Sequence, residues 1–393
     1  MANVSSSNGL EKHPKLRFPG FDKPWKVFKA EELFQNITDK NHPDETVLTI
    51  IQGKGTLPRE QAGRNIHYDD ASLSNYKKVE QGDFIIHLRS FEGGLEMANE
   101  AGIVSPAYTI LRCKRPHSSL FYDAYFHTDE FINHNLSKSV EGIRDGRQIS
   151  YEAFKWLGIP YCEPTEQEKI SNLFAALNER IAKQRDLIEA LKKYKRGLLM
   201  HYFSDDKTQL WTQCSVSQIG KVITGSTPPT NDRSNYDGDL LFCAPGDVGE
   251  QKYISSTEKR VSPKGFALGR PLPPNSVIVT CIGLIGKLGI AKTSMITNQQ
   301  INALVVSEGF DHEFIYYAFE NFFPEYRSKV SMQTLPILSK SEFEKLMIKV
   351  PDLDVQHKIS SHLAAMDRRI EHTQQELNAL IEHRRGIMQQ LFI

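Results

Sequence analysis

Two glycine-containing segments in the first part of the sequence carry basic side chains that could contact DNA. The segment QGKGTLPREQAGRN (residues 52–65) contains Lys54, Arg59 and Arg64, and IRDGRQ (residues 143–148) contains Arg144 and Arg147. Arginine can pair with two acceptor atoms of guanine, and both arginine and lysine bind phosphates. Because loops on a rigid scaffold present such side chains, we predict that these five residues contact DNA.

The second part of the sequence offers a different set of side chains. GSTPPTNDRSN (residues 225–235) combines turn-forming Gly, Pro and Asn with residues that can reach base edges or phosphates. The predicted DNA contacts here are Thr227, Thr230, Arg233, Asn235, Lys252, Lys264, Arg270, Lys287 and Gln333, the last opposite the Arg144 region.

Each of these predictions has a structural alternative. A lone Arg or Lys can be a solvated surface charge, and Asp145 could pair with a neighbouring arginine and make its turn structural. GSTPP could be a turn with an exposed proline pair. TNQQIN (residues 297–302) could be a strand whose glutamines only satisfy backbone groups.

Patterns for covalent chemistry are missing from the sequence. There is no Asn-Pro-Pro-aromatic or Asp-Pro-Pro-aromatic element with a glycine-rich cofactor loop, and GLIGKLG does not have the spacing of a phosphate-binding loop. A convincing PD…(D/E)-x-K nuclease motif is missing, because no acidic residue stands two positions before Lys54. The histidines form no H-E-x-x-H element, and the five cysteines form no C-x-x-C pair. We therefore predict that this chain is not itself an enzyme and holds no metal or cofactor.

An internal repeat organises these segments. EQEKISNLFAALNERIAKQRDLIEALKKYKRGLLMHYF, from Glu166, and VQHKISSHLAAMDRRIEHTQQELNALIEHRRGIMQQLFI, from Val355, match at a constant offset of 189 residues. Upstream of these segments, GDFIIHL aligns with NSVIVTC, and Trp25 corresponds to Trp211. We predict that both tryptophans are core anchors rather than platforms for stacked bases.

Both copies of the repeat end in a long amphipathic segment. Apolar residues recur there at spacings of four and three, which is typical of paired helices. We predict an intramolecular antiparallel pair with a seam formed by Ile170, Phe174, Leu177, Ile181, Ile188, Leu191, Leu198, Ile359, Leu363, Met366, Ile370, Leu377, Leu380 and Ile387.

The remaining segments mix short strands and helices. GDFIIHL, PAYTILRC, SVIVTCIG and NALVV read as strands, and SYEAFKWLGIP and DHEFIYYAFENFFPEYRSKV read as helices. We predict an α+β fold in which two pseudo-repeated α/β domains are separated by two long antiparallel coiled-coil helices. The predicted boundaries are 1–160 and 204–351 for the domains, and 161–203 and 352–393 for the helices.

In this order, the motifs closely resemble the specificity subunit of type I restriction–modification systems. In the first half the resemblance rests on GDFIIHLRSFEGGLEMANEAGIVSPAYTIL and SVEGIRDGRQISYEAFKWLGIP, and in the second on GKVITGSTPPTNDRSNY, TNQQINALVV and LSKSEFEKLMIKVP. Each half then continues into EQEKI or VQHKI, so the resemblance covers nearly the whole chain.

The resemblance implies a division of labour among subunits. Each α/β domain would be a target-recognition domain that reads one half of a bipartite site in double-stranded DNA, and the helices would set the spacer. Two methylation (M) subunits would methylate adenine with S-adenosylmethionine, and two restriction (R) motor subunits, where present, would cleave DNA with ATP and Mg²⁺. The second half has MQTLP where the first has IRDGRQ, which predicts two different half-sites.

Two other kinds of function stay open at this point. One is a self-contained DNA methyltransferase or nuclease, and the other is a structural coiled-coil adaptor. The formal net charge of +0 confines any DNA-binding surface to local patches. We expect a cytoplasmic protein that does not bind membranes, because no apolar stretch or signal core is present.

Four apolar helix residues outside the seam are predicted docking positions for the methylation subunits: Leu173, Leu187, Leu199 and Phe203. For Phe203 and its counterpart Phe392, the alternative is that each helix end packs on a globular domain.

Overall fold

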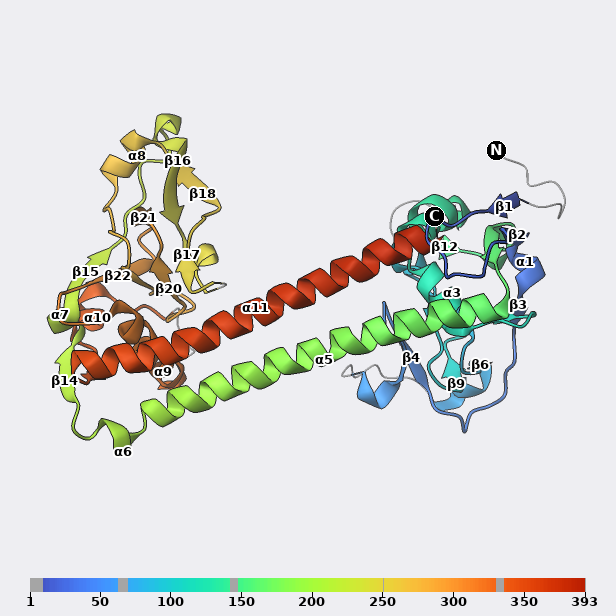
Figure 1. The fold of residues 1–393 in the computed structure, drawn as a ribbon, viewed down its shortest axis with the longest axis horizontal. Helices are drawn as coiled ribbons and strands as arrows, with labels where there is room; N and C mark the ends of the chain where they lie inside the picture. Colours follow the sequence, from blue (N-terminus) through green and yellow to red (C-terminus); the bar gives the residue numbers. More distant parts are fainter. Residues whose placement is uncertain (1–9, 63–69, 142–147, 250, 330–335, 393) are drawn as a thin grey trace. The chain divides into compact units, whose positions relative to one another are not determined.

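The computed structural model describes residues 10–62, 70–141, 148–249, 251–329 and 336–392. The chain forms two compact units: unit 1 is Met1–Arg185 with Glu376–Ile393, and unit 2 is Asp186–Gln375. Two long helices, α5 (Pro164–Tyr202) and α11 (Leu353–Phe392), contribute residues to both units (Figure 1). The unit limits therefore fall inside these helices, and the predicted domain boundaries stay a prediction.

The described residues of unit 1 form two antiparallel sheets and three two-stranded pairs. One sheet has the order β1-β2-β13 and the other β3-β10-β7-β8. The strands are β1 (Leu10–Lys12), β2 (Trp25–Lys29), β3 (Phe34–Ile37), β7 (Phe84–Ile86), β8 (Glu96–Met97), β10 (Thr109–Cys113), β13 (Gly158–Tyr161), and the pairs β4 (Leu48–Ile51) with β5 (Gly55–Pro58), β6 (Lys77–Val79) with β9 (Gly102–Val104), and β11 (Val140–Glu141) with β12 (Gln148–Ile149).

Short helices complete unit 1 and close its aromatic core. The α-helices are α1 (Ala30–Leu33), α2 (Ser90–Gly93), α3 (Ser119–Phe126) and α4 (Tyr151–Phe154). Fully buried aromatic rings from α3, β3 and β7 pack against one another. The rings of Phe84 and Phe126, for example, lie edge to face with their centroids 4.9 Å apart. The core therefore fixes α3 on one face of the four-stranded sheet.

Unit 2 repeats this plan with additions. Its main sheet has the order β15-β22-β19-β20-β17, beside a three-stranded sheet β18-β16-β21 and the pair β14-β23. The strands are β14 (Thr212–Ser215), β15 (Gly220–Thr224), β16 (Tyr236–Cys243), β17 (Tyr253–Ile254), β18 (Lys259–Val261), β19 (Val277–Thr280), β20 (Leu288–Ala291), β21 (Met295–Thr297), β22 (Ile301–Val306) and β23 (Met347–Val350); the helices are α6 (Asp205–Thr208), α7 (Val216–Ile219), α8 (Pro263–Leu268), α9 (His312–Lys329) and α10 (Lys340–Lys345).

The two units share strand order and register, so the sequence repeat is a structural repeat. The order β3-β10-β7-β8 in unit 1 matches β15-β22-β19-β20 in unit 2. Ile85 pairs with Glu96, and its counterpart Ile278 pairs with Gly289. The predicted α+β fold and the predicted strands are confirmed, as is the helix α9.

One predicted helix is mostly wrong. In SYEAFKWLGIP only α4 (Tyr151–Phe154) is helical, and Gly158–Tyr161 forms the strand β13, paired with β2. Gly158 and Pro160 cannot continue a helix favourably, and the pairing of Ile159 with Phe28 supplies the backbone partners that extended residues need.

Equivalent residues join the start of each long helix to its own unit. The Gln167 amide donates to the Cys162 carbonyl (2.8 Å), and its oxygen accepts from the Ser118 N–H (3.0 Å). Gln356 does the same with the Pro351 carbonyl (2.8 Å) and the Asp311 N–H (2.9 Å). Both glutamines are buried, so the matching Gln in each copy has the same structural role.

Within each unit, the two long helices run antiparallel. In unit 1 the rings of Phe174 and Phe392 are stacked with their centroids 6.3 Å apart, and Gln184 Nε2 donates to Glu376 Oε2 (2.8 Å). In unit 2 Lys195 pairs with Asp367 (2.7 Å), and Tyr202 hydrogen-bonds to His362. Partner numbers fall along α11 as they rise along α5, as the predicted antiparallel pair requires.

All fourteen predicted seam residues are buried or half-buried. The outer ones, however, pack into the cores of the units rather than only against the partner helix. Ile170 and Phe174 belong to the core of unit 1, and Ile359 and Leu363 to the core of unit 2. Within each unit, residues of a long helix are thus part of the α/β core.

Among the described residues, no helix is long and apolar enough to cross a lipid bilayer. The same residues include no group of three or more His, Cys, Asp and Glu side chains arranged to hold a metal ion.

Candidate nucleic-acid interface

The β4–β5 hairpin of unit 1 carries Lys54 at its exposed tip. Gly53 and Gly55 flank this lysine with φ values of +73° and +76°, a conformation that favours glycine. The carboxylate of Glu96, on β8, accepts from the Gly53 N–H (2.6 Å) and the Gly55 N–H (2.9 Å). The Asn99 amide donates to the carbonyls of Lys54 (2.8 Å) and Thr56 (2.9 Å). The tip is therefore held from its inner side while the Lys54 side chain faces solvent.

Glu96 and His127 form an inner ion pair below this tip. Their side chains are 0% and 21% exposed, and Glu96 Oε1 lies 3.4 Å from His127 Nε2. Burial opposes the charge on Glu96, but His127 and the two glycine N–H groups outweigh it and lower the Glu96 pKa. Burial likewise opposes the charge on His127, yet Glu96 and Asp123 raise the His127 pKa to about 9. Both residues are thus charged at neutral pH.

The other predicted contacts of unit 1 are placed less fully. Arg59 is half-buried, begins the 3₁₀ turn Arg59–Gln61, and donates its backbone N–H to Val47. Arg64, Arg144 and Arg147 lie outside the described residues, as does Gln333 of unit 2. All five stay predictions.

In unit 2, the GSTPP segment lies directly against the turn between β21 and β22. The Ser226 N–H donates to the Thr297 carbonyl (2.8 Å), and the Gly225 N–H to the Ile301 carbonyl (3.0 Å). The exposed Thr227 hydroxyl donates to Gln299 Oε1 (2.6 Å). We call Gly225–Thr230 together with Asn298–Gln300 the polar loop cluster. It presents hydroxyl and amide groups where β15 and β21 end and β22 begins, the kind of groups that read base edges.

Two predicted residues near this cluster are structural. Asn235 is 1% exposed and donates to the Pro229 carbonyl (3.0 Å), so it shapes the loop and cannot reach a base. Lys252 donates to the Tyr317 hydroxyl (2.9 Å) and pairs with Glu313 (3.1 Å), with a side chain only 12% exposed. We correct the prediction for both, because their polar atoms are bound inside unit 2.

The remaining predicted residues of unit 2 reach its surface to different degrees. Thr230 and Arg233 are exposed, whereas Lys287 is half-buried. Lys264 is exposed but pairs with Asp232 (2.7 Å), and Arg270 donates to the Thr224 carbonyl (2.8 Å) at the base of the polar loop cluster. These five residues stay predicted DNA contacts.

Sequence reasoning missed two residues of these sites. The sequence pattern favours a strand at Gln299, but β22 begins only at Ile301, and Gln299 is an exposed turn residue. Nothing in the local sequence marks Glu96 as a buried acid that binds a hairpin more than forty residues upstream. For Gln299, the polar run TNQQ before a buried apolar strand is a usable signal of a turn.

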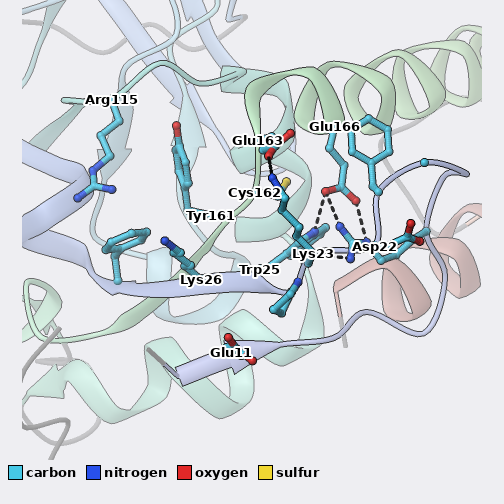
Figure 2. Close-up of a pocket in the computed structure, with 15 residues that line it drawn as sticks. Glu11, Asp22, Lys23, Trp25, Lys26, Arg115, Tyr161, Cys162, Glu163 and Glu166 are labelled. Carbon is cyan, nitrogen blue, oxygen red and sulfur yellow. Dashed lines mark hydrogen bonds and ion pairs between the residues drawn. The ribbon is translucent and has the colours of Figure 1, made fainter. Parts of the chain in front are cut away.

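Unit 1 also contains a pocket of about 560 Å³ bordered by the β1–β2 region and the start of α5 (Figure 2). In its interior Glu166 accepts from Arg17 (2.8 Å) and from the Trp25 indole N–H (3.0 Å), and at its exposed rim Lys23 lies 3.4 Å from Glu163. Arg115 lies over the Phe28 ring at 4.0 Å. These contacts tie the first strands to α5.

The polar loop cluster should depend on the absence of a side chain at Gly225. A Cβ there would lie 2.1 Å from the Asn298 carbonyl oxygen and 2.3 Å from that of Thr297. We therefore expect Gly225→Ala to lower the free energy of unfolding of the protein by about 1–3 kcal/mol, because a buried backbone contact must open. Denaturant titration followed by tryptophan fluorescence measures this. Gly246→Ala is the control, since a Cβ added to Gly246 would have no atom within 4 Å; equal effects would contradict the prediction.

The comparisons with known proteins point to one family. The model of the type I restriction modification DNA specificity domain matches residues 209–383. The chain is 30% identical over 178 residues to the MjaIX specificity subunit of Methanocaldococcus jannaschii, covering 44% of this chain and 41% of that protein. It is 29% identical over 108 residues to the HindI specificity subunit of Haemophilus influenzae, covering 27% and 24%. These alignments therefore span less than half of either relative.

Solved structures of the same kind share the fold over nearly the whole chain. The type I S subunit from M. genitalium superposes with a TM-score of 0.58 at 15% identity, covering 97% of this chain and 99% of that one. A chain from a type I R-M system gives a TM-score of 0.60 at 16% identity, covering 96% and 99%. At such identities the likeness shows the fold.

Proposed function

Because this chain belongs to the specificity subunits of type I restriction–modification systems, we propose that it directs partner enzymes to a bipartite DNA sequence without catalysing a reaction itself. One observation carries the proposal: the chain contains one fold twice, with the same strand order, yet with unlike polar loops at its surface. A shared scaffold with different loops suits two readers of two different half-sites.

In this proposal, unit 1 contacts one half-site through the β4–β5 hairpin and unit 2 the other through the polar loop cluster. Lys54 and Arg233 supply phosphate contacts, and Thr227 and Gln299 lie where base edges would be read. The helices α5 and α11, each with residues in both units, would set the number of unread base pairs between the half-sites.

The proposed partners are double-stranded DNA, two methylation subunits and, in a cleaving system, two restriction subunits. S-adenosylmethionine, ATP and Mg²⁺ would bind to those subunits. Of the four predicted docking residues, Leu199 and Phe203 are corrected: Leu199 is 6% exposed in the core of unit 2, and Phe203 packs on Trp211 and Phe314. Leu173 is half-buried and packs against the core of unit 1, so it too is corrected. Leu187 stays a proposed docking residue at 41% exposure, with Tyr194 one heptad later at 57%.

The proposal is tested by mapping methylated adenines across the genome with and without the gene for this chain. We expect one bipartite motif, two short specified blocks around an unspecified spacer, to lose its methylation when the gene is deleted. Exchanging residues 10–160 for those of a relative with another target should change one block only. Unchanged methylation after deletion would refute the proposal, and methyl transfer by the purified chain alone would favour an enzyme instead.

Surface charges in the two units should act on DNA binding through phosphates. We expect Lys54→Ala and Arg233→Ala each to weaken binding of the complex by about three- to tenfold and to reduce the slope of log K against log[salt] by about 1. Fluorescence anisotropy at several salt concentrations measures both quantities. Lys192→Ala, an exposed helix residue paired with Glu189, is the control. An undiminished salt slope for both variants would show that neither residue contacts a phosphate.

A further inference from the structure

We infer that Glu96 is a positioning residue that fixes the hairpin tip of unit 1, and through it Lys54, for recognition of one half-site. The inference rests on the proposed function and adds to it a residue that affects binding of one half-site although it touches no DNA itself. Glu96 is 0% exposed, so its influence on DNA must pass through the backbone that it binds.

The geometry at the tip uses both carboxylate oxygens. Oε1 accepts from the Gly53 N–H and Oε2 from the Gly55 N–H, the two residues on either side of Lys54. A carboxylate can accept at both oxygens, whereas an amide side chain must donate at one end. Two bonds to one carboxylate leave the backbone on either side of Lys54 little freedom, so the point from which the lysine side chain extends is set before DNA arrives and the entropic cost of its contact is lower.

Asn99 supports the same tip from a second side. Its amide donates to the Lys54 and Thr56 carbonyls, and its backbone N–H donates to the Thr56 hydroxyl (3.0 Å). Three consecutive residues of the tip, Gly53 to Gly55, and the following Thr56 are thus bound to residues 96–99. These bonds attach the exposed tip to residues 96–99 in addition to the pairing of β4 with β5.

The buried charge of Glu96 is compensated mainly by His127. Asp123 Oδ1 lies 3.6 Å from His127 Nδ1, and His87 interacts electrostatically with both members of the pair, while Arg89 and Arg384 act on His87 and on Asp123 respectively. An uncompensated buried carboxylate would be costly. The histidine therefore makes it possible for unit 1 to place a strong double acceptor under the hairpin.

Unit 2 lacks this device at the equivalent place. By sheet register, Glu96 corresponds to Gly289, since Ile85 pairs with Glu96 and Ile278 with Gly289. A Cβ on Gly289 would lie 2.7 Å from Ile254 Cδ1, because strand β17 packs there and pairs with β20. The two units thus share a fold but attach a different segment at this position. In unit 1 the carboxylate of Glu96 binds the tip of the β4–β5 hairpin, and in unit 2 strand β17 pairs with β20. Glu96 is accordingly expected to affect one half-site only.

The test compares Glu96→Gln with Glu100→Gln, a change of the same charge at an exposed residue of the following turn. Both are made in the complex of this chain with its methylation subunits. The probes are duplexes carrying the mapped bipartite site, altered in one half or the other. We expect Glu96→Gln to weaken binding by about three- to tenfold on duplexes that keep the half read by unit 1, and by less than about twofold on duplexes in which that half is altered, because the Lys54 phosphate contact depends on unit 1 being placed on its half-site.

A double-mutant cycle tests the route through Lys54. Lys54→Ala should weaken binding by about three- to tenfold in the parent protein. In the Glu96→Gln protein it should weaken binding by less than about twofold, because the contact between Lys54 and DNA is already weakened there. Equal losses in both backgrounds would overturn the inference. Asn99→Ala, at an exposed position, supplies a second variant that should show the same one-sided loss if Glu96→Gln fails to fold.

Hydrogen–deuterium exchange separates this inference from the proposed function. Peptides covering residues 50–58 should exchange at least about fivefold faster in Glu96→Gln than in Glu100→Gln without any DNA present. If the tip loosens but the parent complex shows no preference for a bipartite site, the proposed function fails while the structural role holds. If the parent discriminates and Glu96→Gln matches it in exchange and in both half-sites, the positioning role is refuted.

Discussion

Phe392→Ala is expected to lower the free energy of unfolding of unit 1 by about 3–5 kcal/mol. Phe392 is 0% exposed near the end of α11. The centroid of its ring lies 6.0 Å from that of Trp25, 5.3 Å from that of Phe121 and 5.5 Å from that of Tyr125. Removing the ring leaves a cavity in an aromatic core whose other members cannot collapse into it without breaking their own contacts. Denaturant unfolding, fitted with separate transitions for the two units, measures the loss.

The matched control is Met200→Ala, an apolar residue near the end of the other long helix that is 71% exposed. It should change the free energy of unfolding by no more than about 0.5 kcal/mol. A loss below about 1 kcal/mol for Phe392→Ala would mean that the end of α11 is not part of the core of unit 1.

Lys195→Ala is expected to lower the free energy of unfolding of unit 2 by about 3–5 kcal/mol at neutral pH. Lys195 Nζ lies 2.9 Å from Glu320 and 2.7 Å from Asp367, with a side chain 12% exposed, and it joins α5 to α9 and α11. Burial already raises the Glu320 pKa. Without the lysine, two neighbouring carboxylates would remain with no cation between them.

The loss should depend on pH in a defined direction. A carboxyl group whose pKa is raised by folding binds more protons in the folded state, so its penalty is present above that pKa and disappears as pH falls toward the unfolded value, near 4.5. The stability difference between parent and variant should therefore shrink between pH 7 and pH 5. Lys192→Ala, three residues earlier and exposed, should lose about 0.5 kcal/mol or less at any of these pH values. A deficit independent of pH would contradict the role of the carboxylates.

Most of the architecture is predictable from the sequence, and the reason lies in the repeat. Paired positions such as Gln167 with Gln356 and Phe203 with Phe392 keep the same kinds of partner in both units, so one constant offset locates both helices and both cores. The seam follows from spacing alone. Spacing does not say what covers a residue, and for that reason it assigns Ile170 and Ile359 to the helix pair although they also complete the cores.

The candidate sites are less accessible to prediction. Asn235 and Arg233 lie in one loop and are both polar, yet the Asn235 side chain is buried and donates to the Pro229 carbonyl while Arg233 is exposed. Glu96 and Gly53 meet only because β5 packs beside β8. Such pairings are set by tertiary packing over long separations, which neither composition nor periodicity encodes.

The division of the chain into units has a consequence for biosynthesis. Unit 2 is one continuous stretch, Asp186–Gln375, whereas unit 1 combines residues made before that stretch with Glu376–Ile393, made after it. During translation, the unit that starts first is then completed second, because Phe392 emerges from the ribosome only after all of unit 2 has been synthesised. Until then the aromatic core of unit 1 lacks the Phe392 ring, so unit 1 cannot complete its packing before the whole of unit 2 has been synthesised.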